Sequence, residues 1–254
     1  MHGFFHGRLC FAVASGLALL MAVANTSAAY PNGPLHYVTD TAPYCAGCHM
    51  SLDRETMRGY DDDLVSTYMA EETHYREIRE GLKEYEKLSA KEREQLLEDV
   101  KMVDQNASVT LEIVQTAAPG EAITATVTAR GGADPHIGIQ LLDVAHRFQA
   151  RALSAVGWEI VGSPKVIGPD DKEQTAWMER RLPDLGQNIN FVVVFGTEAD
   201  LKAGKFSACQ VIFTLKAPSK PGKYPIAAAF LYGTEKASPL GRVKKIGGDM
   251  PLGG

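Results

Sequence analysis

The hydrophobic pattern of the chain changes its period at Gln105-Asn106, and this change separates two kinds of structure. Before it, apolar residues recur at helical spacing, and after it apolar and polar residues alternate as in strands that bury one face. The chain has 254 residues, 45% of them hydrophobic, which suffices for one large domain or two modest ones. The sequence therefore predicts an α+β protein with a helical part followed by a β-rich part.

The β-rich part predicts seven short strands with no helix between them. They are residues 108–114, 122–128, 137–142, 157–161, 190–195, 208–215 and 224–232. Residues 119–121 predict a turn between the first two strands, and Lys220-Pro221-Gly222-Lys223 predicts a hairpin between the last two. This pattern is typical of an antiparallel, immunoglobulin-like β-sandwich, expected over residues 106–240. The glycine-rich residues 241–254 are expected to form a flexible tail.

The helical part is expected over residues 30–105, with helices over 63–84 and 90–103. Ser89 followed by Glu92 is a capping-box signal for the start of the second helix. Apolar residues then fall on one stripe of that helix, at Leu96, Leu97, Val100 and Val103.

The first 29 residues have the pattern of a secretory signal peptide. A weakly basic start is followed by an apolar run over residues 9–24 and by the small residues Ser27-Ala28-Ala29. The apolar run has 16 residues, fewer than the about 20 that span a bilayer. We therefore expect cleavage after Ala29 and export to the periplasm, with a membrane tether as the alternative if the leader is not cut.

Loss of the leader removes Cys10 and leaves three cysteines, of which Cys45 and Cys48 are three positions apart. Cys45-Ala46-Gly47-Cys48-His49 fits the Cys-x-x-Cys-His pattern of covalent haem attachment. Two thiols at this spacing can reach both vinyl groups on one edge of a porphyrin, and the histidine that follows then lies under the iron. The sequence therefore predicts one haem c bound to Cys45 and Cys48, with His49 as the proximal iron ligand.

Two other interpretations of the cysteine pair fit the sequence less well. A thioredoxin-like redox pair sits at a strand-to-helix junction, whereas Asp40-Thr41-Ala42-Pro43 before this pair is not strand-like. A structural zinc site needs two further Cys or His ligands at close spacing, and no second pair follows. Cys209 lies in a predicted strand, where we expect it to be a buried small hydrophobic residue.

The plan of signal peptide, Cys-x-x-Cys-His segment and immunoglobulin-like sandwich resembles exported bacterial multidomain cytochromes. The specific resemblance covers the motif and, over residues 89–103, the helix that closes a small class I cytochrome c. It implies a small all-α haem-binding fold, one haem c with its iron, and electron transfer as the activity.

The distal ligand of the iron has two main candidates, His74 and Met69. They lie five residues apart on the predicted helix, so they are separated by about 140° around its axis and only one can face the iron. We expect His74 to be the ligand because Tyr75 beside it offers an aromatic ring to pack on the haem. Met69 is the alternative, and a third interpretation leaves the position open or filled by water.

The charge distribution suggests a partner for the helical part. Residues 40–105 contain 17 acidic and 9 basic residues, whereas the remainder after residue 105 has 14 acidic and 16 basic residues. The acidic surface is either simply solvated or steers the protein toward a redox partner with a basic docking surface. No polybasic stripe is present, so nucleic acid is not expected as a partner.

Three classes of function fit these features. The expected function is periplasmic electron transfer through one haem, with the sandwich as a docking or scaffold domain and no catalytic residues. The alternatives are a haem-based redox or small-ligand sensor or binding module, and a haem enzyme with an open iron position. No Ser/His/Asp constellation, P-loop or nucleotide fingerprint is recognised in the sequence.

Overall fold

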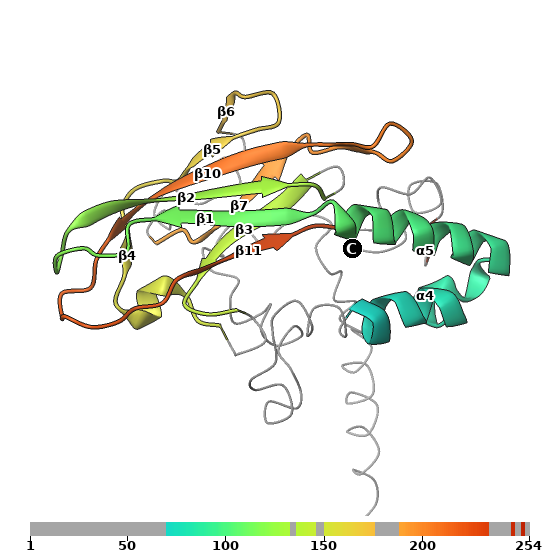
Figure 1. Cartoon of the computed structure of the whole chain (residues 1–254), viewed down its shortest axis with the longest axis horizontal. Coiled ribbons are helices and arrows are strands. Elements are labelled where there is room, and N and C mark those ends of the chain that lie inside the picture. The colour runs from blue at the N-terminus through green and yellow to red at the C-terminus, as the bar shows by residue number, and fades with distance from the viewer. Residues whose placement is uncertain are drawn as a thin grey trace, which may run out of the picture.

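The computed structural model describes residues 70–132, 136–145, 150–175, 188–233, 245–246 and 250–251 (Figure 1). It consists mostly of antiparallel β-sheet with two α-helices, α4 (Arg76–Glu80) and α5 (Ala90–Gln105), which lie at one end of the strands. Within this part of the chain, no helix is both long and apolar enough to cross a membrane.

The first described helix ends earlier than the sequence predicts. A π-helix over Ala70–Tyr75 continues into α4, which ends at Glu80 instead of residue 84. The cause is Gly81, whose φ of 68° is left-handed and whose N–H bonds the carbonyl groups of Glu77 and Ile78. A 3-10 helix over Lys83–Lys87 then leads to α5.

Helix α5 confirms the prediction made for residues 90–103. The Ser89 hydroxyl accepts a hydrogen bond from the Glu92 N–H at 3.3 Å, and the Glu92 carboxylate accepts one from the Ser89 N–H at 2.8 Å. Leu96, Val100 and Val103 are completely buried, so the predicted stripe is the packing face. Most of this face forms a small core with the residues before it, whose buried members are Tyr75, Ile78, Tyr85, Leu88, Leu96 and Val100.

The strands form two main sheets, which we call the six-stranded and the three-stranded sheet. The six-stranded sheet has the order β1 (Ser108–Ile113), β2 (Ala122–Arg130), β10 (Ala208–Lys216), β5 (Lys165–Ile167), β6 (Glu173–Gln174), with β4 (Glu159–Ile160) also paired to β10. The three-stranded sheet has the order β11 (Ala227–Leu231), β3 (His136–Leu142), β7 (Phe191–Phe195). Two short ribbons pair β8 (Ala199–Asp200) with β9 (Lys205–Phe206) and β12 (Lys245–Ile246) with β13 (Met250–Pro251). All of these pairs are antiparallel.

The two main sheets share one apolar core. Alternate residues of β2 and β10 point into it from the six-stranded sheet, and alternate residues of β3 and β7 point into it from the other. Its members include Val127, Phe213, Ile139 and Val192, all completely buried. At one edge the Gln174 amide links the sheets, because it donates to the Phe195 carbonyl and accepts from the Phe195 N–H, both at 2.9 Å.

All seven predicted strands are present, but one connection differs from the prediction. Residues 220–223 do not form a hairpin, because β10 belongs to the six-stranded sheet and β11 pairs with β3 in the other. The segment between them contains Pro218, Pro221 and Pro225, which cannot donate the backbone hydrogen bonds of a continuing ladder. The chain therefore crosses from one sheet to the other here.

Cys209 lies in β10 and is 5% exposed within the core, as predicted. Burial raises the pKa of its thiol to about 11.

Candidate functional site

Most residues of the predicted haem site lie outside the described part of the chain. This holds for Cys45, Cys48, His49 and Met69, and also for the side chain of His74. The backbone of His74 lies in the π-helix, directly before Tyr75. The leader, residues 1–29, also lies outside the described residues.

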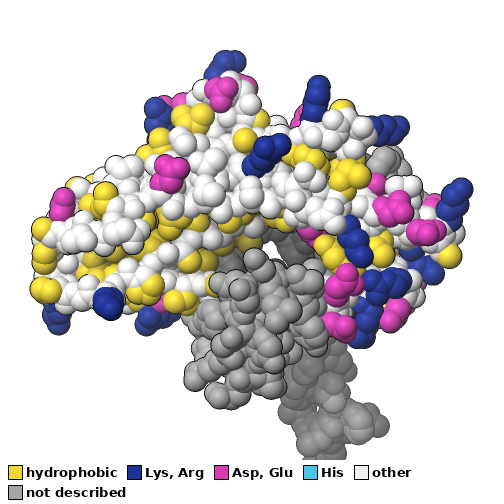
Figure 2. All heavy atoms as spheres, viewed as in Figure 1, with side chains coloured by type: hydrophobic (Ala, Val, Ile, Leu, Met, Phe, Trp, Pro, Cys, Tyr) yellow, Lys and Arg dark blue, Asp and Glu magenta, His cyan; other side chains and the backbone are white. Residues whose placement is uncertain are grey.

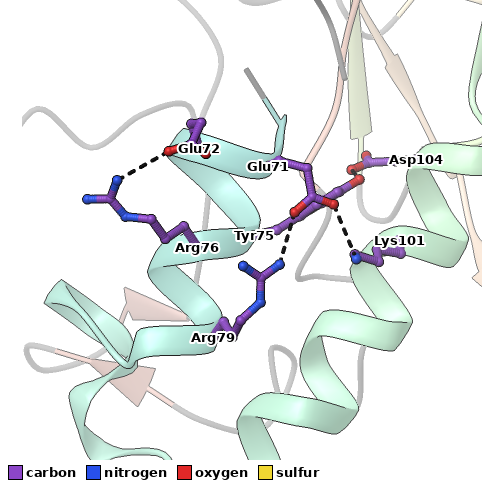
Figure 3. A network of polar contacts seen from close by, with 7 residues as sticks. All are labelled: Glu71, Glu72, Tyr75, Arg76, Arg79, Lys101 and Asp104. Atoms are coloured by element: carbon purple, nitrogen blue, oxygen red, sulfur yellow. Dashed lines mark hydrogen bonds and ion pairs between the residues drawn. The ribbon is translucent and has the colours of Figure 1, made fainter. Parts of the chain in front are cut away.

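The described site nearest to His74 is a cluster that joins the helices to the strands. The Tyr75 hydroxyl donates to Asp104 Oδ2 at 2.6 Å, and the Tyr232 hydroxyl donates to Asp104 Oδ1 at 3.2 Å. Figure 3 shows the Tyr75 side chain reaching from the π-helix toward Asp104 on α5. We call these three residues the tyrosine–aspartate junction.

Three different elements supply the junction. Tyr75 is the last residue of the π-helix, Asp104 lies in the last turn of α5, and Tyr232 directly follows β11. A carboxylate at a helix C-terminus is disfavoured by the helix dipole, and the two hydroxyl donors offset this cost. Val103, next to Asp104, forms an apolar cluster with Ala199 against which Tyr232 packs, so apolar packing accompanies the polar contact.

Both tyrosines keep their protons at neutral pH. Burial is the main cause that raises the pKa of Tyr75, and its hydrogen bond to Asp104 raises it further. Burial is also the main cause of the raised pKa of Tyr232, followed by the negative charge of Asp104. The two phenols therefore act as fixed donors to one carboxylate.

Ion pairs surround the junction on its solvent side. The Glu71 carboxylate accepts from Arg79 Nη2 at 2.9 Å and from Lys101 Nζ at 3.4 Å. The hydrogen bond from Arg79 is the main cause that lowers the pKa of Glu71. Lys101 Nζ also lies 5.0 Å from the centre of the Tyr75 ring, a cation–π contact. These exposed pairs orient the side chains more than they stabilise the fold.

The junction fixes the backbone on which the predicted distal ligand lies. π-Helices are rare, but those that exist are often found at functional sites, and this one contains His74. Tyr75 is 8% exposed and belongs to the helical core that also contains Ile78 and Val100. Sequence reasoning missed this anchoring role of Tyr75, and it missed Asp104 and Tyr232 altogether.

A second feature is a pocket of about 520 Å³ at the end of the sheets opposite the helices. The connections that follow β1 and β10 surround it, and Trp158 and Tyr224 line it with their rings edge to face at 6.4 Å. Four of the lining residues are prolines: Pro119, Pro218, Pro221 and Pro225. The Tyr224 hydroxyl donates to the Lys220 carbonyl at 2.9 Å, which holds this wall in place.

Among the described residues, no group of three His, Cys, Asp or Glu side chains is arranged to hold a metal ion. Comparison of the chain with protein-family models, with curated proteins and with solved structures found no match.

Proposed function

We propose that the chain is an exported c-type cytochrome that transfers electrons in the periplasm through one haem. The observation that carries this proposal is the sequence Cys45-Ala46-Gly47-Cys48-His49 downstream of a leader with the pattern of a signal peptide. Cys45 and Cys48 hold the haem covalently, and His49 is the proximal ligand. The bound iron supplies one-electron chemistry, and the protein supplies ligation, burial and a docking surface.

The helical part, residues 30–105, is the haem-binding domain in this proposal, with an all-α fold like that of a small class I cytochrome c. In support, α5 starts with a complete capping box and buries an apolar stripe, as a closing helix does. The leader over residues 1–29 directs export and is cut after Ala29.

The β-rich part, residues 106–240, is an immunoglobulin-like sandwich in this proposal. A constant-type immunoglobulin domain has strands A-B-E-D in one sheet and C-F-G in the other. β1, β2, β10 and β5 follow the A-B-E-D order, and β3 pairs with β11 as C pairs with F. β7 departs from that plan, because it adds a strand at the other edge of β3.

The distal ligand in this proposal is His74. The junction supports this choice because it holds Tyr75, the next residue, by a hydrogen bond to Asp104 and by burial. Replacing His74 by Ala should convert a low-spin haem to a high-spin one, whereas Met69→Ala should leave the spectrum unchanged. The opposite result would assign the ligand to Met69.

A redox partner with a basic surface is the proposed docking partner, and the sandwich orients the haem domain on it. The described helices have 11 acidic and 7 basic residues over 70–105. Figure 2 shows acidic and basic side chains interspersed over the helices at the right of the view. Part of the acidic surface is therefore already paired, for example Glu72 with Arg76 at 3.3 Å and Glu71 with Arg79 at 2.9 Å. Association should slow as salt rises.

A second candidate function, a sensor or ligand-binding module, is favoured by the pocket beside Trp158 and Tyr224. Its volume of about 520 Å³ is that of a small-molecule site. The absorption spectrum of the purified protein separates the candidates. Low-spin haem in both oxidation states supports electron transfer, whereas a high-spin ferrous form that binds carbon monoxide supports a sensor or an enzyme.

A further inference from the structure

The pocket at the far end of the sheets from α5 lies where the β1–β2 and β10–β11 connections meet (Figure 1). Backbone hydrogen bonds join the two connections: the Ala217 N–H donates to the Glu121 carbonyl at 2.8 Å, and the Gly120 N–H donates to the Ala217 carbonyl at 3.2 Å. The four prolines in the lining fix their own φ angles. The walls are therefore ordered before a ligand arrives, which lowers the entropic cost of binding.

Most of the side chains that line this pocket are apolar. Trp158 and Tyr224 contribute aromatic rings, and Ile113, Ile123 and Ile226 contribute aliphatic surface. The volume of about 520 Å³ lies in the range of small-molecule sites, which commonly combine apolar walls with a few polar groups. The pocket thus suits a small molecule with an apolar body, and its two rings favour an aromatic one.

Lys220 carries the one charge among the lining side chains. It is exposed, and no described residue forms an ion pair with it. The acid that follows the lining residue Pro119 most closely, Glu121, does not line the pocket, and its carboxylate accepts from the Ala118 N–H at 2.6 Å. The charge at the pocket is therefore positive, which favours a negatively charged ligand.

Trp158 supplies an unpaired hydrogen-bond donor as well as a ring. The residue is 8% exposed, and its indole Nε1 is buried with no acceptor among the described residues. An indole N–H can only donate, and a buried donor without an acceptor is destabilising. An oxygen atom of a bound molecule is the kind of partner that this group takes.

We propose that the pocket binds a small aromatic carboxylate, with its ring against Trp158 and Tyr224 and its negative charge toward Lys220. The inference rests on the second candidate function, the binding module, whose class of ligand it names, and it needs no haem. A proline-rich peptide is the rival occupant, because such peptides dock in grooves lined by aromatic residues. The carboxylate is favoured because it also uses the positive charge.

Isothermal titration calorimetry of the full-length mature protein tests this with three probes that share one ring system. They are naphthalene-2-carboxylate, the neutral naphthalene-2-carboxamide and the cationic 2-(aminomethyl)naphthalene, and decaproline represents the rival. We expect the carboxylate to bind about three- to fivefold more tightly than the amide, a modest factor because Lys220 is exposed. The amine should bind most weakly of the three.

Two pairs of variants locate the binding. Lys220→Gln should remove the preference for the carboxylate, whereas Lys223→Gln should keep it, since Lys223 is an exposed lysine of the same connection that does not line the pocket. Val114→Trp should block the pocket and abolish binding, because Val114 lines it and is 57% exposed. Val161→Trp is its control, at an exposed valine outside the lining.

Equal binding of the three probes, tighter binding of decaproline or no binding of the carboxylate would overturn the proposal. So would carboxylate binding that Lys220→Gln and Val114→Trp leave unchanged. The absorption spectrum of the same samples tests the cytochrome separately. A colourless protein that binds the carboxylate keeps the pocket and removes the haem, and a coloured protein that does not bind it does the reverse.

Discussion

Removal of the Tyr75 hydroxyl tests whether the tyrosine–aspartate junction holds the helices on the sheets. Tyr75→Phe keeps the ring in its core and deletes only the donor that lies 2.6 Å from Asp104. Because the acceptor is a carboxylate and Tyr75 is 8% exposed, we expect a loss of about 2 kcal/mol in the free energy of unfolding. For Tyr232→Phe, whose bond is 3.2 Å long, we expect about 1 kcal/mol.

Urea unfolding, followed by far-UV circular dichroism and by tryptophan fluorescence, measures both losses. The loss in the free energy of unfolding of the double variant should differ from the sum of the two single losses, because both hydroxyls bind one carboxylate. Tyr224→Phe is the matched control, since its hydroxyl binds the Lys220 carbonyl at the far end of the sheets and is exposed. We expect it to cost about 0.5 kcal/mol. If Tyr75→Phe costs no more than Tyr224→Phe, the junction does not have the role assigned to it.

Three further predictions concern the described residues. Gly131→Ala should lower the free energy of unfolding in urea by about 1–3 kcal/mol more than Gly120→Ala, and equal losses would contradict this. Both glycines have positive φ, but only a Cβ at Gly131 would meet backbone, 2.5 Å from a carbonyl oxygen at the end of α5. The free energy of unfolding should fall as the pH rises above the ordinary tyrosine pKa of 10.0, because folding raises the pKa of Tyr75 and Tyr232 and these phenols therefore lose their protons first in the unfolded chain. Replacing both tyrosines by Phe should make stability fall less steeply with pH, and an unchanged slope would refute this. The Cys209 thiol should react with a disulfide reagent at mildly alkaline pH only after unfolding, because it is buried and its pKa is raised to about 11; rapid reaction of the native protein would argue against that burial.

The long elements could be predicted because each has a signal within its own residues. The capping box of Ser89 and Glu92 marks the start of α5, and the apolar stripe that follows marks its buried face. The strict alternation of apolar and polar residues predicts β1 and β2, which pair over their whole common length. The sequence predicts burial of Cys209 because it is a small hydrophobic residue in an expected strand, and the structure places it at an inward position of β10.

The short elements and the connections could not be predicted in the same way. β5 and β6 have three and two residues, too few to show a period, and they exist because β10 offers an edge for β5. The segment before β11 has turn residues that suit a hairpin, but β11 finds its partner in β3, more than 80 residues earlier in the chain. Tertiary pairing decides such connections.

The tyrosine–aspartate junction gave no signal in the sequence because its members are far apart. Tyr75 and Asp104 are separated by 29 residues, and Asp104 and Tyr232 by 128. The haem-attachment motif is the opposite case, since five consecutive residues contain the whole pattern. Local chemistry can be recognised in one sequence, whereas a site assembled from a helix end and a strand end cannot.

The covalent bond between protein and haem is the most direct test of the central claim. Mature protein made in a host that attaches c-type haem should show, in its denatured intact mass, the mass of one haem retained by the chain. Cys209→Ser should keep that mass, whereas replacement of both Cys45 and Cys48 by Ser should lose it. A wild-type protein without the added mass, or a Cys45/Cys48 variant that retains it, would contradict the proposal.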